Sequence, residues 1–163
     1  QFAKRGGFCL GVDYNFQAIR AARALAKNHG VGNAVFALLE IDTDRAATLP
    51  RADMVICLSV FHHWARKFGE QQAVEITSAL ASRADRYFVF ETGQPDETSK
   101  DWAQAVEFMN PDSEAWIRTF LTGLGFDQIT SAGPFATNVS DVPRTLYVAY
   151  RSAADSQDSP TAS

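Results

Sequence analysis

This 163-residue sequence lacks the features that mark several common classes of protein. It has only two cysteines, with no CxxC motif and no Cys/His cluster, which argues against a zinc site. No apolar run approaches the roughly 20 residues needed to cross a membrane, and no signal-peptide pattern opens the chain, so we expect a cytoplasmic protein with no membrane association. The net charge of −4 argues against a nucleic-acid partner bound through a basic face.

The composition is that of an ordinary globular domain. With 46% hydrophobic and 21% charged residues, the chain is long and apolar enough to bury a core. Residues 152–163 contain no large apolar side chain, so we expect a disordered tail there. This leaves residues 1–151 as a single partial domain.

Short apolar runs alternate with helix-like segments over residues 8–150. Strands are expected at 8–12, 34–39, 54–60, 87–90, 126–131 and 145–150. Helices are expected at 15–28, 69–83 and 113–124, with a loop or short helix at 42–51 and a short amphipathic segment at 102–109. The alternation predicts an α/β fold, a Rossmann-like layered sandwich with a mostly parallel sheet and a C-terminal antiparallel hairpin. In such a sheet, residues at the carboxyl ends of the strands gather along one edge.

Two aspartates lie at or just beyond the ends of two predicted strands. Asp13 could accept hydrogen bonds from both hydroxyls of a ribose, or it could cap the next helix, and the residue alone leaves these interpretations about even. Its neighbour Tyr14 could stack on an adenine or pack on that helix. Asp42, beside apolar Ile41, could accept from an adenine amino group, although alone it is typical of a solvated loop. Together the two acids fit an adenosine better than chance placement does.

A third buried strand is predicted in the sequence DMVICLSVFHHW, residues 53–64, and it ends in polar and aromatic residues. Within it, His62 or His63 could take a proton from an acceptor hydroxyl. Adjacent residues in a loop point in different directions, so we expect at most one of them to face the acceptor. The alternative is that one packs under the loop and the other is solvated. As a metal site the pair is weak, because neither HxH nor HxxxH spacing occurs.

The order of these segments resembles a class I S-adenosylmethionine-dependent methyltransferase from its second strand to its seventh. Gly11-Val12-Asp13-Tyr14 is similar to the family's ribose-binding strand end, and Ile41-Asp42 to its adenine-binding strand end. Residues 53–64 are similar to its fourth strand and following loop, which borders the methionine part of the cofactor. The resemblance implies S-adenosyl-L-methionine as the cofactor, bound by Asp13, Tyr14, Ile41, Asp42 and Ser59.

The resemblance also implies a reaction, methyl transfer to a small-molecule or glycan-like acceptor, with His63 or His62 as the catalytic base. The phrase Phe90-Glu91-Thr92-Gly93-Gln94, with the Trp-containing stretch after it, is similar to methyltransferase domains of bacterial polysaccharide modification. Glu91 itself could hold a substrate hydroxyl or cap the next turn.

One departure from the family pattern concerns its first strand and its GxGxG loop, which should precede Phe8. The segment Asp13-Tyr14-Asn15-Phe16 has no glycine, so it cannot be that loop. The missing strand lies between the Asp13 and Ser59 strands, and both would lose a hydrogen-bonding neighbour. We therefore expect the chain alone to be marginally stable and to bind the cofactor poorly. A thermal melt tests this, and a clear cofactor-induced rise in melting temperature would contradict it.

Two other functions compete with methyl transfer. A nicotinamide-dependent oxidoreductase also has an acid after its second strand, but no Tyr-x-x-x-Lys pair is present. A truncated domain acting as a non-enzymatic binding module is the other alternative. If the parent gene encodes a glycine-rich strand and loop before Gln1, the enzyme interpretation holds.

Overall fold

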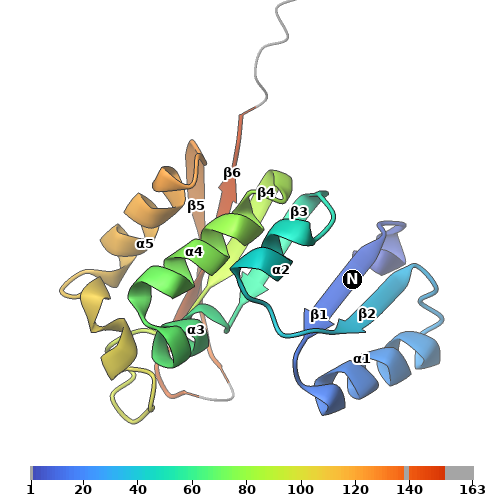
Figure 1. Cartoon of the computed structure of the whole chain (residues 1–163), viewed down its shortest axis with the longest axis horizontal. Coiled ribbons are helices and arrows are strands. Elements are labelled where there is room, and N and C mark those ends of the chain that lie inside the picture. Colours follow the sequence, from blue (N-terminus) through green and yellow to red (C-terminus); the bar gives the residue numbers. More distant parts are fainter. Residues whose placement is uncertain (1, 138–139, 153–163) are drawn as a thin grey trace, which may run out of the picture. The chain divides into compact units, whose positions relative to one another are not determined.

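The structure, a computed structural model, describes residues 2–137 and 140–152 (Figure 1). Its elements are η1 (Ala3–Arg5), β1 (Cys9–Asp13), α1 (Phe16–Asn28), β2 (Ala34–Leu38), α2 (Thr43–Thr48), β3 (Ala52–Leu58), α3 (Phe61–Phe68), α4 (Glu70–Ala81), β4 (Ala84–Glu91), η2 (Gln104–Met109), α5 (Ser113–Gly123), β5 (Gln128–Phe135) and β6 (Arg144–Tyr150). Of the predicted tail, only Ser152 is described, and its N–H donates to Asp127 Oδ1 at 2.9 Å; residues 153–163 lie outside the described part. No described helix is long and apolar enough to cross a membrane.

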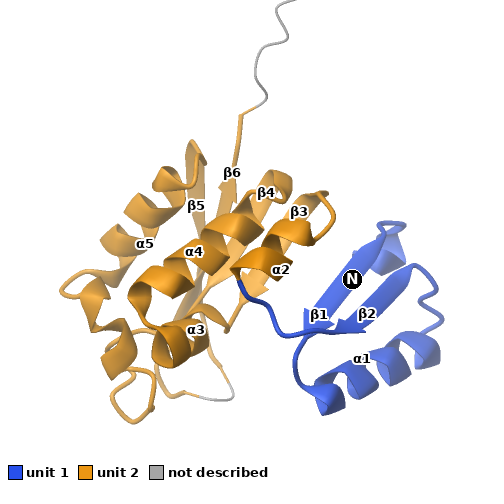
Figure 2. Ribbon diagram, viewed as in Figure 1, with its two compact units in different colours: residues 1–42 blue, residues 43–163 orange. Residues whose placement is uncertain are grey.

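The chain divides into two compact units, residues 1–42 and 43–163 (Figure 2). In the first unit, β1 and β2 pair in parallel and α1 connects them. The helix begins as predicted after Asn15, whose side chain accepts hydrogen bonds from the backbone N–H groups of Gln17 and Ala18. It ends as predicted before Gly30, whose φ of +64° is readily adopted by glycine.

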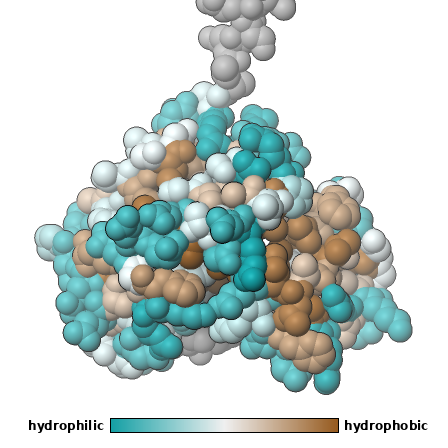
Figure 3. All heavy atoms as spheres, in the orientation of Figure 1, coloured by the Kyte–Doolittle hydropathy of each residue, from teal (hydrophilic) through white to brown (hydrophobic). Residues whose placement is uncertain are grey.

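The first unit has little hydrophobic core. Ile19 is its one buried hydrophobic side chain among the described residues. The large hydrophobic side chains that it exposes are Phe2, Phe8, Leu10, Tyr14, Phe16, Leu25, Val35 and Leu38. Figure 3 shows hydrophobic surface over this unit. Because burial of apolar surface is the main stabilising contribution to folding, this unit by itself has little to stabilise it, and the marginal stability of the chain stays a prediction.

The second unit contains a four-stranded sheet in the order β3-β4-β6-β5, with helices α2 to α5 on one face (Figure 1). β3 and β4 are parallel, and β6 is antiparallel to both β4 and β5, so the predicted C-terminal hairpin is confirmed. Buried aromatic rings pack the sheet against its surroundings. The Phe61 ring of α3 and the Phe90 ring of β4 have centroids 5.7 Å apart, and the Phe88 ring of β4 lies at the same distance from Phe126, in the turn between α5 and β5.

The open edges of β1 and β3 bear on the predicted gap in the sheet. Among the described residues, β1 pairs only with β2 and β3 only with β4. Within the part of the chain that the structure describes, each of these two strands therefore has one edge without a neighbour. The α/β fold with parallel pairing and an antiparallel C-terminal hairpin is confirmed.

Candidate functional site

The residues predicted to form the site fall in both units. Asp13, Tyr14, Ile41 and Asp42 belong to the first unit, and the Ser59 and histidine segment belongs to the second. Within the second unit, hydrogen bonds join Ser59 to Glu91 and Arg144.

Asp13 is the last residue of β1, and one of its carboxylate oxygens is engaged locally. Its Oδ1 accepts the N–H of Asn15 at 2.7 Å, which shapes the turn into α1. Asn15, not Asp13, is the helix cap, so the capping alternative for Asp13 is wrong. Tyr14 is 72% exposed, and its ring is therefore not packed on the helix. The Asp13 carboxylate and the exposed Tyr14 ring are therefore consecutive at the carboxyl end of β1.

Ile41 and Asp42 follow β2 at a greater distance than predicted. The strand ends at Leu38, and a single further hydrogen bond joins the Leu39 N–H to the Asp13 carbonyl at 3.0 Å. Beyond Asp13 the chain turns into α1, and the pairing of β1 with β2 ends at Asp13 and Leu38. Both Ile41 and Asp42 are half-buried, and Asp42 directly precedes α2.

The carboxyl ends of β3 and β4 are joined by a network around the buried Arg144. Its Nη1 donates to Glu91 Oε1 at 3.0 Å and to Ser59 Oγ at 3.3 Å. Its Nε and Nη2 donate to the two oxygens of Glu97 at 3.0 and 2.9 Å, a bidentate pair. Ser59 Oγ in turn donates to Glu91 Oε2 at 2.7 Å. Ser59 also has a φ of +54°, an unusual conformation for a residue other than glycine, at the turn out of β3.

Charge pairing stabilises the ionised forms within this network. Burial is the largest effect on Glu97 and raises its pKa, but hydrogen bonds from Arg144, Gln94 and Ser140 outweigh it, so the pKa lies below its ordinary value. Burial also opposes the charge of Arg144, yet the hydrogen bonds to Glu97 and Glu91 raise its pKa overall. Both groups are therefore charged at neutral pH.

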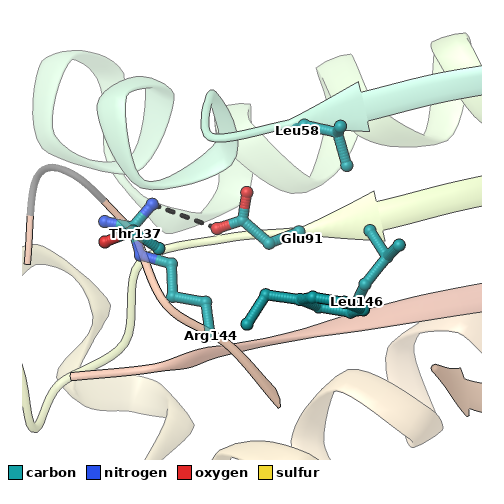
Figure 4. Close-up of a pocket in the computed structure, with 6 residues that line it drawn as sticks. Leu58, Glu91, Thr137, Arg144 and Leu146 are labelled. Atoms are coloured by element: carbon teal, nitrogen blue, oxygen red, sulfur yellow. Dashed lines mark hydrogen bonds and ion pairs between the residues drawn. The ribbon is translucent and has the colours of Figure 1, made fainter. Parts of the chain in front are cut away.

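A pocket of about 210 Å³ opens beside this network (Figure 4). It is lined by Leu58, Glu91, Phe135, Thr137, Arg144 and Leu146. The polar groups come from the end of β4 and the start of β6, and Figure 4 shows the ion pair between them at the pocket. Leucine side chains from β3 and β6 make the walls apolar.

His62 and His63 lie in the first turn of helix α3, so the prediction of a loop here is wrong. Their rings lie together, with centroids 4.2 Å apart. His62 is buried, and its Nδ1 accepts the N–H of Gly93 at 2.8 Å, so the neutral ring carries its proton on Nε2. Burial, together with the nearby charges of His63, Arg144 and Arg66, lowers its pKa to about 3.

His63 is exposed, unlike its neighbour. Its pKa is also lowered, first by desolvation and then by the positive charges of Arg66 and Arg144, so the ring is neutral at pH 7. The Trp102 ring contacts both histidines, at 4.7 and 5.5 Å between centroids, and lies 5.3 Å from the Arg144 guanidinium. The arrangement couples the histidine pair to the charged network through one indole ring.

Other candidate chemistry is weak in the part of the chain that the structure describes. Residues 2–137 and 140–152 hold no cluster of three or more potential metal ligands. Cys57 is buried, and desolvation with the nearby Glu91 raises its pKa to about 12, so its thiol is inert.

Two residues central to the network were not identified from the sequence. Arg144 directly precedes a predicted strand, where an arginine is typical of an exposed turn, and Glu97 lies in the polar run 94–101. Neither position carries a local signal of burial. Their pairing joins residues 47 positions apart, so only the folded chain reveals it.

Comparisons with known proteins give structural matches only. No family model matches the sequence, and no curated protein matches it. The crystal structure of WbdD, described as a bifunctional kinase-methyltransferase, is 27% identical with a TM-score of 0.72 and covers 90% of this chain. Magnesium protoporphyrin IX methyltransferase (ChlM) from Synechocystis PCC 6803 is 25% identical and covers 92% of this chain, with TM-scores of 0.64 with bound SAM and 0.66 with bound SAH.

These matches cover only part of the larger proteins. The chain spans 31% of the WbdD chain and 62–66% of the ChlM chains. The fold class predicted from the sequence is confirmed by the matches, and the ChlM structures with SAM and SAH support S-adenosylmethionine as the cofactor of this fold.

Proposed function

We propose that this chain, which has the fold of the class I S-adenosylmethionine-dependent methyltransferases, contributes to methyl transfer from S-adenosylmethionine to a small-molecule or glycan-like acceptor. The observation that carries the proposal is the match to WbdD over 90% of the chain at 27% identity. WbdD is a bifunctional kinase-methyltransferase, and the ChlM structures hold the cofactor and its product. A cytoplasmic location stays a prediction.

The residues of the first unit suit a nucleoside. Asp13 has acceptor capacity beyond its one bond to Asn15, which suits the paired hydroxyls of a ribose. Tyr14 presents an open aromatic ring and Ile41 a half-buried apolar side chain, both suited to a flat base. Asp42 would accept from the adenine amino group, and Ser59, in the second unit, would border the methionine part.

When bound, the cofactor supplies an activated methyl group on a sulfonium, so the protein needs few catalytic groups. The chain's own residues then have to hold the acceptor in line and keep water away. We assign proton removal to His63, because its ring is exposed and neutral at pH 7. His62 has its Nδ1 engaged by Gly93, so it would position the helix turn and its neighbour.

Titration of the full product of the parent gene tests the proposal. Calorimetry should show binding of S-adenosylhomocysteine and none of NAD. Asp13→Asn should weaken S-adenosylhomocysteine binding about 10- to 100-fold, because hydrogen bonds to a charged group contribute about 1.5–3 kcal/mol. The substitution keeps an oxygen for the Asn15 N–H, so the turn is preserved. Asp53→Asn, an exposed site at the amino end of β3, is the matched control and should bind normally.

Two outcomes would contradict the proposal. Binding of NAD without S-adenosylhomocysteine would favour the oxidoreductase. Binding of neither ligand would favour a non-enzymatic module. Among the described residues β1 pairs only with β2 and β3 only with β4, which is compatible with that alternative.

A further inference from the structure

The charges at the pocket beside Arg144 do not cancel. Glu91 and Glu97 supply two carboxylates against one guanidinium, which leaves a net charge of about −1. The Arg144 and Glu97 side chains are 1% and 0% exposed, whereas Glu91 is 12% exposed and lines the pocket. A ligand in this pocket therefore meets a carboxylate, not the cation.

The hydrogen-bond donors of the pocket are already used within the protein. Each of the three Arg144 nitrogens donates to Glu91 or Glu97, and none of the guanidinium is open to solvent to any useful extent. The Thr137 hydroxyl donates to the Ser140 carbonyl at 3.2 Å. The Ser59 hydroxyl, next to the lining residue Leu58, donates to Glu91. Four of the five Arg144 N–H groups therefore donate within the network, and the fifth, on Nη2, belongs to a side chain that is only 1% exposed, so the pocket offers an anion little to bind.

Acceptor capacity, in contrast, remains. Each Glu91 oxygen accepts one hydrogen bond, from Arg144 or from Ser59. A carboxylate has about four lone-pair sites, so about two are left. The other walls are the apolar side chains Leu58, Phe135 and Leu146, which offer an apolar ring a surface to pack against. At about 210 Å³ the cavity is smaller than the roughly 300–1,000 Å³ of sites for drug-sized ligands, so it suits one ring or substituent.

We propose that this pocket binds a hydrogen-bond-donating part of the ligand, a hydroxyl or an ammonium group on an apolar ring, and rejects carboxylates and phosphates. Resting on the proposed function, this makes the methyl acceptor uncharged or cationic where it contacts Glu91. Glu91 is then the residue that determines specificity.

Three ring compounds that differ in one group provide the test: cyclohexylmethylamine, cyclohexylmethanol and cyclohexanecarboxylate. Each is titrated into the ¹⁵N-labelled 163-residue chain without cofactor, and amide shifts around Glu91 and Leu146 are followed. The amine and the alcohol should bind at least about tenfold more tightly than the carboxylate. In Glu91→Gln the difference between amine and carboxylate should fall to about twofold. Glu75→Gln, an exposed carboxylate on α4 that interacts with Gln71, is the matched control and should keep the wild-type preference.

The inference is overturned if the carboxylate binds as tightly as the amine, if no compound shifts the pocket amides, or if Glu91→Gln keeps the wild-type preference. If Glu91→Gln fails to fold, the comparison of the three compounds on the wild-type chain still tests the inference. Because no cofactor is present, a preference for the carboxylate would refute this inference and leave methyl transfer untouched. Failure to bind S-adenosylhomocysteine would refute methyl transfer and the identification of the ligand as a methyl acceptor, but it would leave the ligand preference of the pocket standing.

Discussion

Replacement of Arg144 with methionine is expected to lower the free energy of unfolding of the second unit by about 3–5 kcal/mol. Methionine retains apolar bulk but removes the cation that pairs with Glu97 and Glu91. Glu97 is 1% exposed, so its carboxylate cannot recover hydration in the folded state and remains buried without a counter-charge. Urea denaturation followed by tryptophan fluorescence measures the loss.

Two further variants separate the loss of the buried pair from the loss of any arginine. Arg51→Met removes an exposed ion pair with Asp85, and its cost should be about 0–1 kcal/mol. The double variant Arg144→Met/Glu97→Met should be more stable than Arg144→Met alone, because it leaves no unpaired charge at Glu97. If Arg144→Met costs no more than Arg51→Met, the network does not stabilise the fold.

The same network has a consequence for function, because it connects segments that line the pocket. Arg144 begins β6, Glu91 ends β4, and Glu97 lies in the connection that carries Trp102. A loss of the guanidinium would therefore release this connection and expose donors and acceptors that are now paired. Stability and ligand preference are expected to change together in Arg144 variants.

Much of the fold could be predicted because its signals are local. Buried parallel strands form continuous apolar runs, and Asn15 is a side-chain cap that marks the start of α1 in the sequence. Helix α3 was missed for the corresponding reason: its cap position is Val60, whose side chain makes no capping hydrogen bond. With no cap and with the strand residues directly before it, the histidine segment has the pattern of a loop.

The site could be predicted only in part because its chemistry depends on distant pairs. Ser59 and Glu91 were recognised as residues at strand ends, where polar groups are expected to gather. Their bonds to Arg144 span 85 and 53 positions, and no spacing in the sequence encodes them. Only the folded structure shows that the Ser59 hydroxyl donates to Glu91 and is not available to a ligand. The excess of hydrogen-bond acceptors in the pocket follows from this.

The stability of the second unit is expected to fall by about 2 kcal/mol between about pH 7.5 and about pH 5 through His62 alone. Its pKa is about 3 in the folded state and about 6.5 when unfolded, because burial disfavours the charged ring. Below pH 6.5 the unfolded chain binds a proton that the folded chain does not, so stability is full above the unfolded pKa and declines as the pH falls. Glu97, whose pKa is lowered, loses its contribution only below about pH 4.3, outside this range.

Urea denaturation of wild type and His62→Asn at a series of pH values measures this contribution. Asparagine has a side-chain oxygen that can accept the Gly93 N–H, the bond that His62 Nδ1 now makes, but it does not titrate. The variant should lose the His62 share of the pH dependence and retain a smaller slope from His63, whose pKa is lowered in the same direction. A wild-type stability that does not change over this range, or a variant with the wild-type slope, would show that the His62 ring is accessible to protons in the folded state.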